Sequence, residues 1–155
     1  MDEKESIRKE LQCTIHPVGY LETYKYVVVC SYYKGQWLLS RHEMRDTWET
    51  QGGHVESGET PMEAAKRELY EESGVSHAEL YTVCDYYGYN SKRHANGVVF
   101  LAMVQELGTL PESEMKETKL FTDLPKNLTY PDVTPVLIKE AEKYGIERGL
   151  ICQIP

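Results

Sequence analysis

The sequence lacks any apolar run that approaches the length of a membrane-spanning helix, although the chain has 155 residues. Its first residues, MDEKE, are mostly charged, and no apolar segment of the kind found in secretory signals follows them. We therefore expect a protein that works away from membranes and is located in the cytoplasm.

Positive charge is also scarce, because 17 lysines and arginines face 25 acidic residues and leave a net charge of −8. Proteins that bind nucleic acid polymers neutralise phosphates with lysine and arginine, so we expect no such polymer as a partner. A small polyphosphate is not excluded, since a bound divalent cation reverses the local sign of the charge.

The four cysteines are dispersed and form no C-x-x-C pair, which argues against a zinc site or a redox motif. Cys30 and Cys84 lie in apolar runs and are expected to be small buried side chains in a reducing compartment. No linker, repeat or low-complexity run divides the chain. The prediction is one domain over residues 1–155, with an N-terminal extension at 1–17 and a C-terminal tail at 146–155.

Hairpins with few helices dominate the predicted elements. The β-branched and aromatic run Tyr24–Tyr33 predicts a buried strand, and residues 1–17 are compatible with a short helix or a leading strand. Helical spacing predicts a last helix over Val133–Tyr144 that Gly145 ends. Strands are predicted at 37–40, 78–89, 97–105 and 117–122, and a charged loop at 41–46. Together these elements favour an α/β sandwich with a mixed sheet.

Between these hairpins, the run from Thr60 to Gly74 carries clear helix boundaries. Thr60 is a good N-cap, Pro61 suits the first helical position, and Glu63 completes a capping box. Gly74 supplies the stop. The sequence therefore predicts a helix over residues 61–73.

Three carboxylates project from one patch of this helix, because Glu68, Glu71 and Glu72 are spaced i, i+3 and i+4. Such a cluster repels itself unless a cation joins it, and Mg²⁺ or Mn²⁺ prefers hard oxygen ligands. The alternative is a solvated acidic face that Lys66 and Arg67 partly neutralise.

The stretch that contains this helix resembles the complete box of the Nudix hydrolases. Gly53 is followed after five residues by Glu59, and after seven more by Arg67-Glu68-Leu69, then Glu71-Glu72 and Gly74-Val75. The resemblance implies a Nudix-type α/β/α sandwich that cleaves a nucleoside diphosphate linked to another group, using metal-activated water. It implies Mg²⁺ or Mn²⁺ held by the Gly52 carbonyl, Glu68, Glu71 and Glu72, with Glu59 as support or as a water-bridged ligand. Arg67 would orient a carboxylate through a bidentate pair, with an ordinary surface arginine as the alternative.

The general base stays open on these grounds. The resemblance implies a glutamate from the box helix or from a later loop, where Glu114 or Glu117 stands. The alternative is that these loop acids are solvent-exposed charges.

Two residues depart from the common pattern of the family. Gln51 stands where a proline is frequent, and His54 stands where a lysine is frequent. His54 could contact phosphate, although a loop histidine more often does not. Neither departure touches the carboxylates.

The substrate is the least determined part. Tyr130-Pro131-Asp132 resembles a stretch that some purine triphosphate members use to stack on and read a base, although Asp132 also suits a helix N-cap. Arg41 opens a basic loop that could meet phosphates or be only solvated. Signatures of the dinucleotide and ADP-ribose subfamilies are missing, which leaves a nucleoside triphosphate, with oxidised purines such as 8-oxo-dGTP as candidates.

Other functions stay open at this point. They are a nucleotide-sensing module without catalysis, a hydrolase of another diphosphate such as a nucleotide sugar or a dinucleotide, and an isomerase on the same scaffold. The sequence does not decide the oligomeric state, and a homodimer is one of the alternatives.

Overall fold

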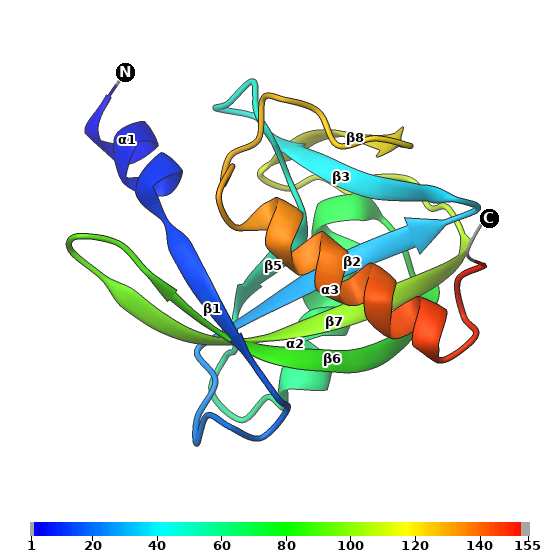
Figure 1. The fold of residues 1–155 in the computed structure, drawn as a ribbon. Coiled ribbons are helices and arrows are strands. Elements are labelled where there is room, and N and C mark those ends of the chain that lie inside the picture. Colours follow the sequence, from blue (N-terminus) through cyan, green and yellow to red (C-terminus); the bar gives the residue numbers. More distant parts are fainter. Residues whose placement is uncertain (1, 153–155) are drawn as a thin grey trace.

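The computed structural model describes residues 2–152 and places two helices on opposite faces of a mixed sheet (Figure 1). Helix α3 (Thr134–Glu147) crosses the front of the sheet, and α2 (Pro61–Ser73) lies behind it. This arrangement confirms the predicted α/β sandwich, and no described helix is long and apolar enough to span a bilayer.

Eight strands form the sheet in the order β1-β6-β7-β2-β3-β4, with β5 also paired to β2 and β8 to β3. Only the β2–β7 pairing is parallel among those described, so the sheet is mixed. The strands are β1 (Gln12–His16), β2 (Tyr26–Tyr33), β3 (Gln36–His42), β4 (Trp48–Glu49), β5 (Gln51–His54), β6 (His77–Tyr89), β7 (His94–Glu106) and β8 (Met115–Phe121).

One edge of β2 serves two partners, which creates a fork in the sheet. The first half of β2 pairs with β5, ending at the pair Val29↔Gln51. The second half pairs with β3, beginning at Ser31↔Leu38. Strand β5 leads directly into the loop before α2. The fork therefore determines where the stretch that resembles the Nudix box begins.

Alternating residues of the central strands fill two cores. Val27 and Val29 of β2 pack with Leu69 on the α2 side, whereas Cys30 packs with Leu137 of α3 on the other. The expected burial of the cysteines is confirmed for Cys30 and Cys84, both free thiols. Burial raises the pKa of the Cys30 thiol, and it raises the pKa of Cys84 to about 12.

The N-terminal segment contains both elements that the sequence left open. Asp2 is the N-cap of helix α1 (Glu3–Glu10), and its side chain accepts a hydrogen bond from the Glu5 backbone N–H. Strand β1 follows and adds to the edge of the sheet beside β6. Met1 of the predicted extension and residues 153–155 of the predicted tail lie outside the described residues.

The end of α3 differs from the prediction. The helix continues past Gly145 to Glu147, so Gly145 is not its stop. A Cβ built at Gly145 would lie 2.6 Å from the Ile151 side chain, and the glycine therefore permits close packing of the chain that returns after the helix. At the other end the N-cap is Val133 and makes no side-chain hydrogen bond, so the N-cap alternative for Asp132 is wrong.

Strand β3 is also longer than predicted. Arg41 and His42 belong to it instead of the charged loop, because both pair with β8.

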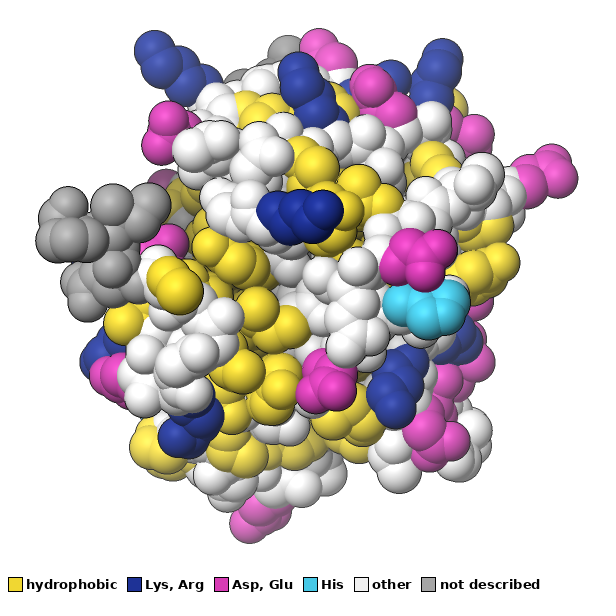
Figure 2. Space-filling view, turned by 90° about the vertical axis from the view of Figure 1, so that its right-hand side faces the viewer, with side chains coloured by type: hydrophobic (Ala, Val, Ile, Leu, Met, Phe, Trp, Pro, Cys, Tyr) yellow, Lys and Arg dark blue, Asp and Glu magenta, His cyan; other side chains and the backbone are white. Residues whose placement is uncertain are grey.

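On the face shown in Figure 2, lysine and arginine side chains are scattered among acidic, polar and apolar ones and form no continuous basic surface.

Candidate active site

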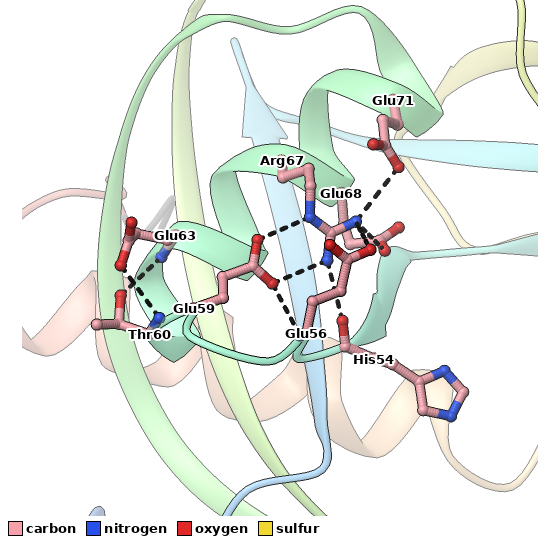
Figure 3. Close-up of polar contacts among 8 residues, drawn as sticks. All are labelled: His54, Glu56, Glu59, Thr60, Glu63, Arg67, Glu68 and Glu71. Atoms are coloured by element: carbon pink, nitrogen blue, oxygen red, sulfur yellow. Dashed lines mark hydrogen bonds and ion pairs between the residues drawn. The ribbon is translucent and has the colours of Figure 1, made fainter.

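The loop before α2 and the helix itself are fixed by their own residues. The Thr60 hydroxyl accepts a hydrogen bond from the Glu63 backbone N–H at 3.1 Å, and Glu63 Oε1 accepts one from the Thr60 backbone N–H at 3.1 Å (Figure 3). Gly74 ends the helix in the left-handed conformation, with φ 80°. The predicted capping box and helix stop are therefore confirmed.

Arg67 lies at the centre of the acidic cluster and binds the loop that precedes the helix. Its Nε donates to Glu59 Oε2 at 2.8 Å and its Nη2 donates to Glu59 Oε1 at 3.0 Å, which makes a bidentate pair. Nη2 also donates to the His54 backbone oxygen at 3.0 Å, while the His54 ring points away from the cluster (Figure 3). Arg67 thus ties the loop to the helix at two places.

The same guanidinium also reaches the helix carboxylates. Nη1 of Arg67 lies 2.8 Å from Glu68 Oε1 and 3.4 Å from Glu71 Oε2. The side chain of Glu68 is only 13% exposed, whereas that of Glu71 is 51% exposed. Arg67 therefore orients the more buried carboxylate firmly and the exposed one loosely.

The Arg67–Glu59 pair gives a prediction about acid stability. Hydrogen bonds from Arg67 lower the pKa of Glu59 from 4.5 to about 2. Because the pKa is lower in the folded state, the stabilisation is complete above pH 4.5 and is lost as the pH falls towards 2. We expect the difference in urea midpoint between the wild type and Glu59→Gln to shrink over this range. A difference that stays constant with pH would contradict this role of the pair.

Glu72 occupies the least favourable place for a charged carboxylate. Its Oε1 accepts a hydrogen bond from the Gly52 backbone N–H at 2.8 Å. The pKa of Glu72 is raised to about 9, mainly by burial; the hydrogen bond from Gly52 lowers it, and the neighbouring carboxylates of Glu68, Glu49 and Glu114 raise it. Burial also raises the pKa of Glu68. A cation placed among these groups would stabilise the charged forms of both Glu72 and Glu68.

The backbone of β5 leaves room for the Glu68 carboxylate only because position 53 is a glycine. A Cβ built at Gly53 would lie 2.5 Å from Glu68 Oε1 and 2.6 Å from its carboxyl carbon. Any side chain here would push the carboxylate out of its place beside Arg67.

The donor set fits a hard divalent cation. Between residues 2 and 152 no three acidic, histidine or cysteine side chains already converge as metal ligands. In this conformation Arg67 holds Glu68 and Glu71, and the Gly52 N–H holds Glu72. Carboxylate oxygens are ligands that Mg²⁺ and Mn²⁺ prefer, and repulsion among these acids favours a cation there.

The two loop acids differ in their surroundings. Glu114 has a side chain 82% exposed, 3.6 Å from His42 Nε2, and its charge acts on the pKa of Glu72. Glu117 instead accepts a hydrogen bond from Arg41 Nε at 2.7 Å. Arg41 also donates to the Arg45 backbone oxygen at 2.9 Å, so protein acceptors engage its guanidinium.

Tyr130 and Asp132, predicted to contact the base, and His54, predicted to contact phosphate, lie in different surroundings. Tyr130 is half-buried, and the charges of Glu49, Arg45 and Glu72 act on its pKa, which burial raises. Asp132 is exposed. The His54 ring packs at a tilt on Tyr26, with 4.3 Å between ring centroids. The charges of Glu49 and Glu72 thus act on Tyr130, whereas His54 meets the acidic cluster through its backbone oxygen and not through its ring.

Sequence reasoning missed Glu49 and a cavity that is lined by its hydrogen-bond partner Arg45. Glu49 is buried and accepts a hydrogen bond from Arg45 Nη1 at 2.9 Å. A cavity of about 510 Å³ lies between α1 and the loop that carries Arg45, and Arg8, Met44 and Thr129 are among its lining residues. The sequence does not indicate that α1 and this loop line one cavity, because they are far apart in the chain.

Comparison with known proteins agrees with this geometry. The profile of the NUDIX domain family matches residues 24–134. YtkD of Bacillus subtilis, provisionally named an 8-oxo-dGTP diphosphatase, is 28% identical over 154 residues, which cover 92% of this chain and 96% of that protein. A mutant of the B. subtilis pyrophosphohydrolase BsRppH superposes with a TM-score of 0.73 and 27% identity, over 87% of this chain and 91% of that one. An RNA pyrophosphohydrolase of Mesorhizobium japonicum is 37% identical over 54 residues, 34% of this chain and 31% of that protein.

Proposed function

The chain belongs to the Nudix hydrolase family, and on this premise we propose that it is a Mg²⁺-dependent pyrophosphohydrolase of nucleoside triphosphates. Members of the family generally use divalent metal cations and act on small nucleotide substrates. The products would be a nucleoside monophosphate and pyrophosphate. The observation that carries the proposal is the carboxylate patch in which Arg67 holds Glu68 and Glu71 and the Gly52 N–H holds Glu72.

The metal ligands in this proposal are the carboxylates of Glu68, Glu71 and Glu72 with the Gly52 carbonyl, and Mn²⁺ would serve as well as Mg²⁺. When bound, the divalent cation lowers the pKa of a water molecule and takes up charge from the phosphates. Glu59 supports the set by holding Arg67, with which it forms the bidentate pair.

Glu114 is the proposed general base. It takes the proton of the water that attacks phosphorus, while the anhydride oxygen leaves with the pyrophosphate. Glu114 suits this role better than Glu117, since its carboxylate is exposed and acts on Glu72, whereas Glu117 is paired with Arg41. Arg41 would then touch phosphate only by giving up that pair.

The nucleoside is proposed to lie on the Tyr130 side of the carboxylates. The cavity of about 510 Å³ includes Leu128 and Thr129, which directly precede Tyr130 in the chain. Stacking on the Tyr130 ring and a hydrogen bond to Asp132 would hold a purine, and His54 would approach the phosphates from β5. An oxidised purine is the finer proposal, supported by the name of the B. subtilis relative.

A 5′-triphosphorylated RNA is a second candidate substrate, because RNA pyrophosphohydrolases are among the relatives that match part of the chain. The chemistry at phosphorus would be the same. The net charge of −8 disfavours a long polymer but not the triphosphate end of one.

A substrate panel tests the proposal. We expect the wild-type protein to release pyrophosphate from nucleoside triphosphates in Mg²⁺ or Mn²⁺ and to stop when the metal is chelated. The panel includes dGTP, 8-oxo-dGTP, a 5′-triphosphorylated oligonucleotide, a dinucleotide and a nucleotide sugar, and kcat/KM ranks them. No turnover of any diphosphate, or turnover that chelation leaves unchanged, would contradict the proposal. Thermal stabilisation by nucleotides without hydrolysis would instead favour a sensing module.

We also propose that residues 1–155 form one catalytic domain that works in the cytoplasm as a monomer or a homodimer. The free buried thiols of Cys30 and Cys84 support a reducing compartment.

A further inference from the structure

Gln51 is a fully buried polar side chain at the fork between β3 and β5. Its Oε1 accepts a hydrogen bond from the Ser31 hydroxyl at 2.7 Å. Its Nε2 donates to the Leu38 backbone oxygen at 3.1 Å and to the Ser40 hydroxyl at 2.9 Å. The amide therefore joins β2 to β3 where these strands separate.

The direction of these hydrogen bonds is fixed by chemistry. The Leu38 carbonyl can only accept, so the amide nitrogen of Gln51 must face it. The second N–H of that nitrogen occupies a lone pair of the Ser40 oxygen. Ser40 must then give its own proton elsewhere, and it donates to the Glu72 backbone oxygen at 2.8 Å.

Glu72 therefore accepts two hydrogen bonds, one at its backbone oxygen and one at its carboxylate, and both donors are next to Gln51 in the structure or in the chain. Ser40 binds its backbone carbonyl, which lies in the last turn of α2, where carbonyls have no partner within the helix. The Gly52 N–H, one residue after Gln51, binds its carboxylate at 2.8 Å. The position and the direction of the carboxylate are thus set from the same short segment.

We propose that Gln51 and Ser40 are positioning residues that hold Glu72 ready for a divalent cation. This inference rests on the proposed function, because it assigns Glu72 to the metal. A proline, which is frequent at this position of the Nudix box, has no side-chain amide. The hydrogen bonds of the Gln51 amide are therefore specific to sequences that have glutamine here. The fold alone requires only that buried polar groups be paired.

Ser31 provides a matched control for Ser40. Both serines are buried, with exposed fractions of 1% and 0%, and both bind the Gln51 amide. Only Ser40 continues to Glu72. Ser31→Ala removes the hydrogen bond that Gln51 Oε1 accepts, whereas Ser40→Ala removes one of the two that Gln51 Nε2 donates and also the one that the Glu72 backbone oxygen accepts. Both variants should lose thermal stability, and Ser40→Ala should lose at least as much as Ser31→Ala.

The test is a titration of Mn²⁺ into wild type, Ser40→Ala and Ser31→Ala, followed by electron paramagnetic resonance. We expect Ser40→Ala to weaken Mn²⁺ binding about 10-fold, the scale known for groups that orient metal ligands, and Ser31→Ala to weaken it less than about twofold. The concentration of Mg²⁺ needed for half-maximal activity should rise by the same factor in Ser40→Ala, while KM for the nucleotide at saturating metal stays unchanged.

Equal Mn²⁺ affinity in the two variants would overturn the inference and leave the proposed function standing. If the wild type itself binds no Mn²⁺, the proposed metal site fails, and the inference fails with it. If it binds Mn²⁺ and cleaves no nucleotide, the proposed function fails, and the ratio of affinities still decides the inference. Should the alanine variants not fold, Ser40→Cys and Ser31→Cys keep more volume with a weaker donor, and the same difference between them is expected.

Discussion

Replacing Glu71 by glutamine is expected to lower the turnover of nucleoside triphosphates by at least about 100-fold without changing the stability of the protein. The Glu71 side chain is 51% exposed, and its contact in the fold is a 3.4 Å approach to Arg67. Glutamine keeps the shape and removes the charge. The folded protein therefore loses little, since exposed substitutions change stability by only about 0.5 kcal/mol or less, whereas the metal site loses a charged ligand.

Steady-state rates across a series of Mg²⁺ concentrations measure the loss of turnover, and a thermal melt measures the stability. Glu142→Gln is the matched control, because Glu142 is also an exposed helical glutamate and lies on α3. It should match the wild type in both measurements. A Glu71→Gln enzyme with the wild-type rate would show that Glu71 is not a metal ligand, and a lower melting temperature would show that its role is structural.

The acidic helix could be predicted from the sequence because its determinants are local. Thr60 and Glu63 are three residues apart and Gly74 directly follows the helix, so short-range chemistry fixes both ends. The spacing of Glu68, Glu71 and Glu72 then places them on one face for any regular helix. The family resemblance added the expected chemistry, and the match over residues 24–134 confirmed the family.

The partners of these residues could not be predicted, because they come from distant parts of the chain. Glu117 is 76 residues from Arg41 and reaches it only through the β3–β8 pairing. The sequence shows Gln51 only as a departure from the family pattern, because its hydrogen bond to Ser40 depends on the fork of β2. Gly145 was expected to end a helix, but packing against Ile151 decides its place.

The Glu72→Gln variant is expected to stabilise the metal-free protein and to lower the activity by at least about 100-fold. The pKa of Glu72 is raised from 4.5 to about 9 in the fold. A carboxyl group with a raised pKa stabilises most below pH 4.5, and that contribution is lost as the pH rises through 9. Glutamine does not titrate and still offers an oxygen to the Gly52 N–H, so the gain at pH 7 is up to about 3 kcal/mol.

Urea denaturation of both proteins in chelator at pH 5, 7 and 9 measures this gain, which should widen as the pH rises. Glu71→Gln is the control, and at pH 7 its stability should stay close to that of the wild type, because the Glu71 side chain is exposed. Added Mg²⁺ should stabilise the wild type more than Glu72→Gln, because the variant lacks one of the three proposed carboxylate ligands. A less stable Glu72→Gln protein at pH 9, or one with normal activity, would contradict the assignment. The opposite signs expected for stability and activity separate a carboxylate kept for metal binding from one kept for folding.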